Sequence, residues 1–241
     1  MSIQPTALSR IPSIPAPLRP EPTGAFELVM RDSPRLNEAL LDERNLSTWL
    51  TKFLGISVLG LGVHGVAVGL VAQLGLRSGA LSAFDWLQGN PLVWMPLSVV
   101  GAMLGALAIC LPSFYFYTQL AGLDASFRLI TAEALRVQAR TSVLLLAALP
   151  FYVALGLGSL VVRSIDAQLV LVVGLVFPFL VGLAGIHSLH KAFEELVEIL
   201  PTTHLRRGDF LMRLVLCWGA VYSAVAPVAL YRLGQGLGAS F

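Results

Sequence analysis

The sequence predicts an all-α integral membrane protein with five transmembrane helices. Charged residues make up 12% of the 241-residue chain, well below the roughly 25% that soluble domains carry. The charges that remain lie mostly between long uncharged runs, and each run is long enough to cross the hydrocarbon layer of about 30 Å. A net charge of +2 gives no electrostatic basis for binding nucleic acid. We therefore expect the lipid bilayer to be the environment of the chain, with no nucleic-acid partner.

The N-terminal segment, residues 1–33, is rich in proline and lacks the apolar stretch of a cleaved signal peptide. We predict a disordered or polyproline-like tail here, because proline interrupts helix and sheet hydrogen bonding. Ser33 followed by Pro34 is typical of a helix start. Residues 34–47 are expected to form a short amphipathic helix on the membrane surface, with a plain solvated helix as the alternative. Its apolar face consists of Leu36, Leu40 and Leu41.

Five apolar segments follow, and the sequence predicts a membrane span in each of them. The spans cover about 50–74, 92–117, 141–162, 167–187 and 210–233. With their connections they form a membrane domain over residues 48–233, and a glycine-rich tail occupies 234–241. Ser47 is the expected cap of the first span. Small residues four apart let helix backbones approach closely in lipid, so we interpret Gly65 with Gly69, and Gly101 with Gly105, as packing sites.

A basic amphipathic connector, residues 124–140, lies between the second and third spans. Asp124 is its expected N-cap. Its apolar stripe consists of Phe127, Ile130, Ala134 and Val137. The connector is expected either to lie on the membrane surface against anionic lipid or to pack under the bundle. The candidate surface for lipid or a protein partner consists of Arg128, Arg136, Arg140, Arg206 and Arg207.

Basic residues are distributed unevenly between the two sides of the membrane. Thirteen of the sixteen Lys and Arg residues fall on the side of the N-terminal segment, the connector and the loop before the fifth span. The other side receives Arg77, Arg163 and Arg232. Because cytoplasmic loops carry the excess of Lys and Arg, we predict a cytoplasmic N-terminus and an exoplasmic C-terminus.

Two sets of polar residues are candidates for chemistry. His64 lies near the middle of the first span, where ionisable residues are functional candidates, but no charged residue stands at that depth to form a relay. We therefore expect a neutral histidine bonded to a neighbouring helix. His187, His190 and Glu194 share one helix face and are candidate metal ligands, although a polar cap at the end of the fourth span is the simpler interpretation. We predict no catalytic site, cofactor or metal.

From the connector onward the chain resembles the Yip1 family of small polytopic membrane proteins. The resemblance rests on LAGLDASFRLITAEAL, RTSVLLLAALPFYVALG and GLAGIHSLHKAF, and covers about residues 121–193. It implies five spans and a cytoplasmic N-terminus. Eukaryotic members bind small GTPases in vesicle traffic, whereas the bacterial-type members that this chain resembles have no settled role. No functional residue is carried over, and we expect the bacterial inner (cytoplasmic) membrane.

Three functions are compatible with these patterns. The first is a non-enzymatic scaffold or partner-binding subunit of a membrane complex, with a cytoplasmic protein or a second copy of the chain as its partner. The alternative is an ABC-like permease subunit, which the prolines within the spans and His64 favour. A polar cavity reaching the middle of the membrane would favour the permease, and a bundle packed closely by glycine and alanine would favour the scaffold. A metal-dependent enzyme comes third, and it requires His187 and His190 to converge with another ligand.

Overall fold

The computed structural model describes residues 29–30, 36, 40–41, 43–79, 81, 89–123, 125–161, 166–199 and 207–240. Five long helices account for most of these residues, and no strand occurs among them. All five helices are long and apolar enough to cross a membrane, which confirms the prediction of an all-α chain with five candidate spans. The helices are α3 (Glu43–Arg77), α4 (Pro91–Leu120), α5 (Phe127–Val161), α6 (Ala167–Ile199) and α7 (Arg207–Gly238).

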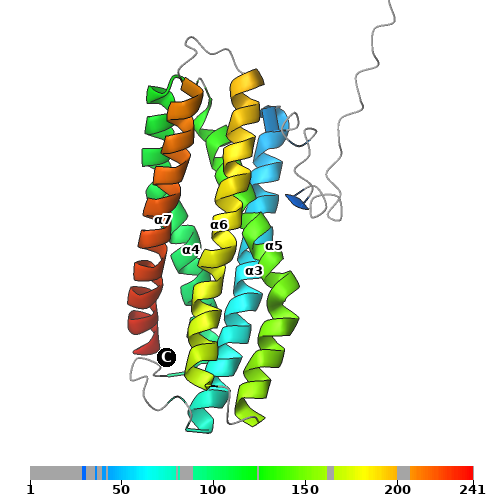
Figure 1. Cartoon of the computed structure of the whole chain (residues 1–241), viewed down its shortest axis with the longest axis vertical. Helices are drawn as coiled ribbons and strands as arrows, with labels where there is room; N and C mark the ends of the chain where they lie inside the picture. The colour runs from blue at the N-terminus through cyan, green and yellow to red at the C-terminus, as the bar shows by residue number, and fades with distance from the viewer. Residues whose placement is uncertain are drawn as a thin grey trace, which may run out of the picture.

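The helices run up and down along one long axis (Figure 1). The starts of α3, α5 and α7 lie at the same end as the last turns of α4 and α6, and the end of α7 lies at the opposite end. We call the end of the bundle where α5 begins the α5-start end, and the end where α7 finishes the α7-tail end. A helix of 30 to 35 residues is about 45 to 52 Å long at 1.5 Å per residue, so each helix extends beyond the hydrocarbon layer.

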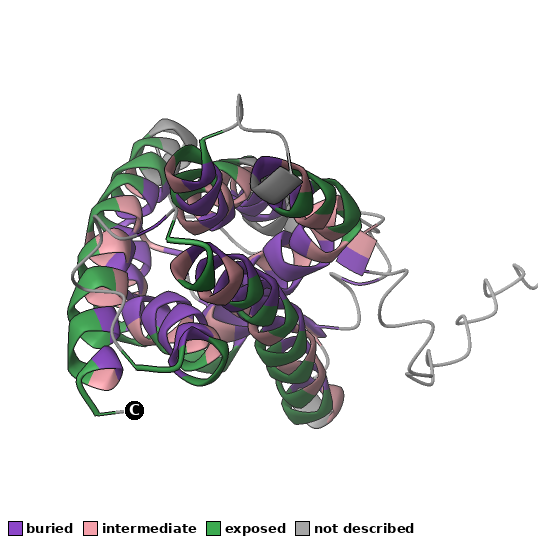
Figure 2. Ribbon diagram, turned by 90° about the horizontal axis from the view of Figure 1, so that it is seen from below, coloured by how far each residue is buried: buried purple, intermediate pink, exposed green. Residues whose placement is uncertain are grey.

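Helix α3 is at the centre of the packing. It contacts both α4 and α5 extensively, while α7 packs on α4 and α6 packs on α5. Helices α6 and α7 contact each other much less. Seen along the bundle, the buried faces turn inward and the exposed faces turn outward (Figure 2). Many exposed side chains are large and apolar, as expected where lipid replaces water as the solvent.

Glycines on α3 set the distance between α3 and α4. A Cβ atom on Gly65 would lie 2.5 Å from the Cα of Pro96, and one on Gly69 would lie 2.5 Å from the carbonyl oxygen of Pro91. This pair is a packing site within the chain, as predicted. Gly105 has no atom within 4 Å of such a Cβ position, so the Gly101–Gly105 pair does not make the same close approach.

The helix ends use local caps. Asn90 Oδ1 accepts from the backbone N–H of Leu92, with Pro91 in the first helical position of α4. Helix α4 ends at Leu120, and Gly122, which follows the C-cap Ala121, has a φ of 80°, the left-handed conformation that glycine adopts without strain. Ser126 Oγ accepts from the Leu129 N–H at the start of α5. The expected cap of this helix, Asp124, lies outside the described residues.

Two predicted boundaries are absent from the structure. Helix α3 passes through Ser47 without a break, and the Ser47 carbonyl accepts from Thr51 Oγ1 within the helix. The connector and the third span form one helix, α5. Of the predicted surface helix 34–47, the described Leu36 and Leu40 are buried in the main core together with Trp49. Because Trp49 is already buried two residues after Ser47, α3 is packed in the core at this point, and Ser47 is an internal residue of the helix rather than its cap.

Candidate functional site

The most polar part of the interior lies at the α5-start end. Helix α5 places Glu133, Arg136 and Gln138 inside the bundle, with 1%, 4% and 4% of each residue exposed. Arg136 Nη1 lies 3.4 Å from Glu133 Oε2, one helical turn away. Removing two charges from water is costly unless they pair, and this ion pair offsets part of that cost. We call these three residues the α5 polar layer.

Helix α7 hydrogen-bonds to this layer and to α4. The Tyr222 hydroxyl lies 3.1 Å from Gln138 Oε1 on α5 and 3.1 Å from the Met103 carbonyl oxygen on α4, so it can donate to either acceptor. The Trp218 indole N–H donates to the Cys110 carbonyl at 3.1 Å. Each of these bonds joins α7 to a helix far away in the sequence, and together they fix its rotation about its own axis.

An aromatic cluster packs beside these hydrogen bonds. The Phe114 ring lies 4.7 Å from the Trp218 ring and 5.4 Å from the Phe193 ring, measured between centroids. Trp218 stacks on Tyr222 at 5.6 Å. Such pairs stabilise a core beyond the area that they bury, so α4, α6 and α7 are held firmly at this end.

Helix α5 is also joined to α3 and α6. Arg140 Nη1 donates to Ser188 Oγ on α6 at 2.7 Å. The Ser142 hydroxyl lies 3.2 Å from the Ile56 carbonyl oxygen on α3. A Cβ atom on Gly60 would lie 2.7 Å from Ser142 Cβ, so the two backbones approach closely at this contact.

The predicted arginine surface is divided by the structure. Arg128 is exposed, Arg140 is half-buried and Arg136 is buried. Arg136 therefore does not lie on a surface for lipid or a partner, because its pairing with Glu133 holds it inside the bundle. Arg206 lies outside the described residues, and Arg207 begins α7 with a side chain that is not described.

The histidines of α6 are not brought together with a third ligand. His190 Nε2 lies 3.4 Å from Glu194 Oε1, while the His187 ring lies 6.4 Å from the His190 ring. Among the residues that the structure describes, no group of three potential metal ligands occurs. The metal-dependent enzyme therefore gains no support from this face of α6.

His64 is buried where three helices meet. Its Nε2 lies 3.0 Å from the Gly174 carbonyl oxygen on α6. Because a carbonyl only accepts, we assign the ring hydrogen to Nε2. The other ring nitrogen, Nδ1, has no hydrogen-bond partner among the described residues, and neither has the hydroxyl of Tyr152. This is the predicted bond from His64 to a neighbouring helix.

Tyr152 and Gly174 complete this contact. The two rings of Tyr152 and His64 are 5.9 Å apart, and a Cβ atom on Gly174 would overlap the Tyr152 hydroxyl. Neither residue was predicted from the sequence to belong to this contact. A glycine within the otherwise bulky run VLVVGLVF is the signal that indicates this close approach.

Comparison with known proteins adds no relative. No family model, curated protein or solved structure matches the chain. The resemblance to the Yip1 family accordingly stays a prediction, and the function is argued from this structure alone.

Proposed function

We propose that the protein is a non-enzymatic membrane scaffold that binds a protein partner at the α5-start end of the bundle. The observation that carries the proposal is the α5 polar layer. This layer is buried, and the Tyr222 hydroxyl connects it to α7 and α4. Because these contacts hold the helices in fixed positions, this end of the bundle is a preorganised platform. Preorganisation lowers the entropy that a partner must lose on binding.

Exposed polar side chains surround this platform. They are Arg128 on α5, His187, Lys191 and Glu194 on α6, and Arg213 on α7. Their mixed charge suits a soluble partner, because complementary charges speed encounter and fix orientation. Most of the basic residues in the described helices also lie toward this end, so the proposal places it in the cytoplasm, with the bacterial inner membrane as the host.

The test is purification in a gentle detergent through an N-terminal tag, followed by mass spectrometry of the proteins that remain bound. The docking variant combines Arg128→Glu, Lys191→Glu and Arg213→Glu. We expect a stoichiometric partner with the unaltered chain and its loss from this variant.

The matched control reverses charge at the opposite end. Arg77 and Arg232 are both exposed at the α7-tail end, so Arg77→Glu with Arg232→Glu should retain the partner. Equal recovery of the partner by both variants, or recovery of the chain alone in every sample, would contradict the proposal. Thermal unfolding of each variant shows whether the bundle is intact.

The alternative is a permease-type transport subunit. His64 favours it, because its Nδ1 is buried without a hydrogen-bond partner among the described residues. A transport path would bring water to this position. With Cys110→Ala and Cys217→Ser as background, His64→Cys should react with a membrane-impermeant thiol reagent in a permease and stay unreactive in a scaffold. Arg128→Cys serves as the reactive control.

A further inference from the structure

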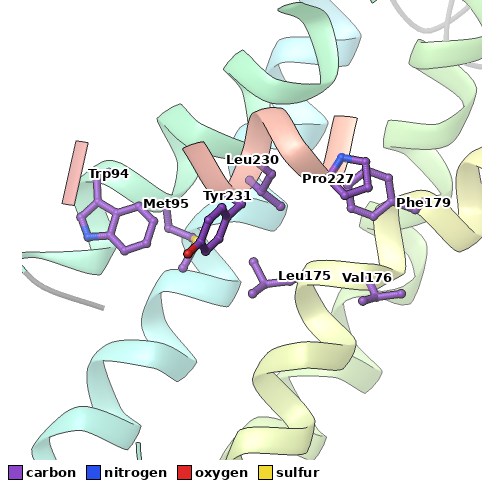
Figure 3. Close-up of a pocket in the computed structure, with 8 residues that line it drawn as sticks. All are labelled: Trp94, Met95, Leu175, Val176, Phe179, Pro227, Leu230 and Tyr231. Atoms are coloured by element: carbon purple, nitrogen blue, oxygen red, sulfur yellow. The ribbon is translucent and has the colours of Figure 1, made fainter. Parts of the chain in front are cut away.

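A cavity lies where α6 and α7 separate, at the half of the bundle nearer the α7-tail end. Its volume is about 190 Å³. The lining residues come from three helices, as Figure 3 shows. They are Trp94 and Met95 of α4, Leu175, Val176 and Phe179 of α6, and Pro227, Leu230 and Tyr231 of α7.

The lining is almost entirely apolar, and the cavity opens sideways. Val176 and Tyr231 are 42% and 52% exposed, and both lie on the lateral surface of the bundle rather than at its ends. In a membrane that surface faces lipid. An apolar cavity of about 150 Å³ stays dry and binds a ligand as small as benzene, so this larger one favours an apolar occupant over water.

A polar pair lies next to the apolar lining. Gln235 Nε2 donates to the Tyr231 hydroxyl at 2.8 Å, and both residues are exposed. Gln235 lies one turn nearer the end of α7 than Tyr231. Trp94 is only one turn from the start of α4, at the same end of the bundle. Tyrosine and tryptophan concentrate at the depth of the lipid headgroups, so the cavity extends from headgroup depth toward the bilayer centre.

We propose that this cavity binds one acyl chain of a bilayer phospholipid, with the ester and headgroup region against Tyr231 and Gln235. The apolar lining matches the chain, the lateral opening gives entry from the bilayer, and the polar pair lies where the chain joins its headgroup. A transmembrane helix is about 10 Å across and is too wide for a space of this volume. The proposal is independent of the scaffold function.

The test uses Trp94 as the reporter. Trp49→Phe, Trp86→Phe and Trp218→Phe leave Trp94 as the single tryptophan, and a thermal melt establishes that the bundle stays folded without the Trp218 hydrogen bond. The protein is then reconstituted in vesicles of phosphatidylcholine brominated on its acyl chains. Trp94 is 1% exposed and lines the cavity, so an acyl chain inside the cavity brings bromine closer to its ring than lipid on the outer surface does. We expect strong quenching relative to unbrominated vesicles.

Val176→Phe fills the cavity, and Val172→Phe is the matched control. Val172 lies one turn earlier on α6 with 43% exposure, against 42% for Val176, and does not line the cavity. Val176→Phe should reduce quenching at least twofold, and Val172→Phe should leave it unchanged. Equal quenching in both variants would mean that only surrounding lipid reaches Trp94, and the proposal would fail.

Native mass spectrometry of the purified protein supplies a second measurement. We expect about one phospholipid to stay bound to the unaltered chain and to the Val172→Phe control, and to be lost from Val176→Phe. Retention of detergent in place of phospholipid in the unaltered chain would also overturn the proposal.

Discussion

Gly174 illustrates how a single position holds three helices together. Its carbonyl accepts from His64 on α3, and its Cα faces the Tyr152 hydroxyl on α5. Only a hydrogen side chain leaves room for both neighbours. The sequence predicted the bond from His64 but not its acceptor, because a backbone carbonyl leaves no mark in the sequence.

Gly174→Ala should destabilise the bundle by about 1 to 3 kcal/mol, the usual cost of overpacking. The new methyl group would meet Tyr152 and push α6 away from His64. Gly182→Ala is the control, since no atom lies within 4 Å of a Cβ at that position and alanine favours helix. Thermal unfolding in detergent measures both, and an equal effect of the two substitutions would refute this role of Gly174.

The Glu133–Arg136 pair makes a second local prediction. Arg136→Met should lower the free energy of unfolding by about 3 to 5 kcal/mol, because it removes the guanidinium that pairs with the buried Glu133 carboxylate. Glu133→Leu combined with Arg136→Met should recover most of that loss, since both buried charges are then removed. Thermal unfolding of the single and double variants measures this. A double variant no more stable than Arg136→Met would show that the two side chains do not act as a pair.

Among the helices, sequence patterns predicted five segments that the structure shows as helices long and apolar enough to span a membrane. Long uncharged runs are unambiguous because lipid penalises charge. The beginnings of α3 and α5 were predicted less well. Ser47 was predicted as a cap, and the connector as a separate helix either on the membrane surface or under the bundle. Instead, burial of Trp49 and Glu133 draws these segments into the continuous helices α3 and α5. The local spacing of residues does not reveal such contacts, because the helices that make them are far apart in the sequence.

The α3–α4 contact allows a direct comparison of two glycine pairs. Gly69→Val should reduce stability by about 1 to 3 kcal/mol, because the Pro91 carbonyl lies where the new side chain must go. Gly105→Val should have a much smaller effect, since its Cβ position is open. The fraction of monodisperse protein after heating, measured by size-exclusion chromatography, distinguishes the two. A larger loss from Gly105→Val would point to packing against another chain at that position.

The two halves of the bundle differ in their interior, with a buried polar layer in one and an apolar lateral cavity in the other. The α5 polar layer and its hydrogen bonds lie at the end where α5 begins, and the lateral cavity lies toward the other. The positions of Lys and Arg along the sequence predicted on which side of the membrane the basic residues gather. They did not predict the cavity, because the separation of α6 from α7 depends on how all five helices pack.

Orientation in the membrane follows from the same asymmetry. A reporter fused after Phe241 is expected to be exoplasmic, and one fused before Met1 cytoplasmic, because the basic residues gather on the N-terminal side. Paired alkaline phosphatase and green fluorescent protein fusions at both positions measure this directly. Fluorescence from the C-terminal fusion would reverse the assignment of the platform to the cytoplasm.

The hydrogen bonds of α7 also bear on how the protein is made. Synthesis runs from the N-terminus. Helices α3 to α6 therefore enter the membrane while Trp218 and Tyr222 are still in the ribosomal exit tunnel or not yet synthesised. Until α7 arrives, Gln138 lacks its tyrosine partner and the Phe114 ring lacks its tryptophan neighbour. A nascent chain halted after α6 would therefore expose an amide and an aromatic surface to lipid, the kind of defect by which membrane quality-control proteases distinguish unfinished proteins from mature ones.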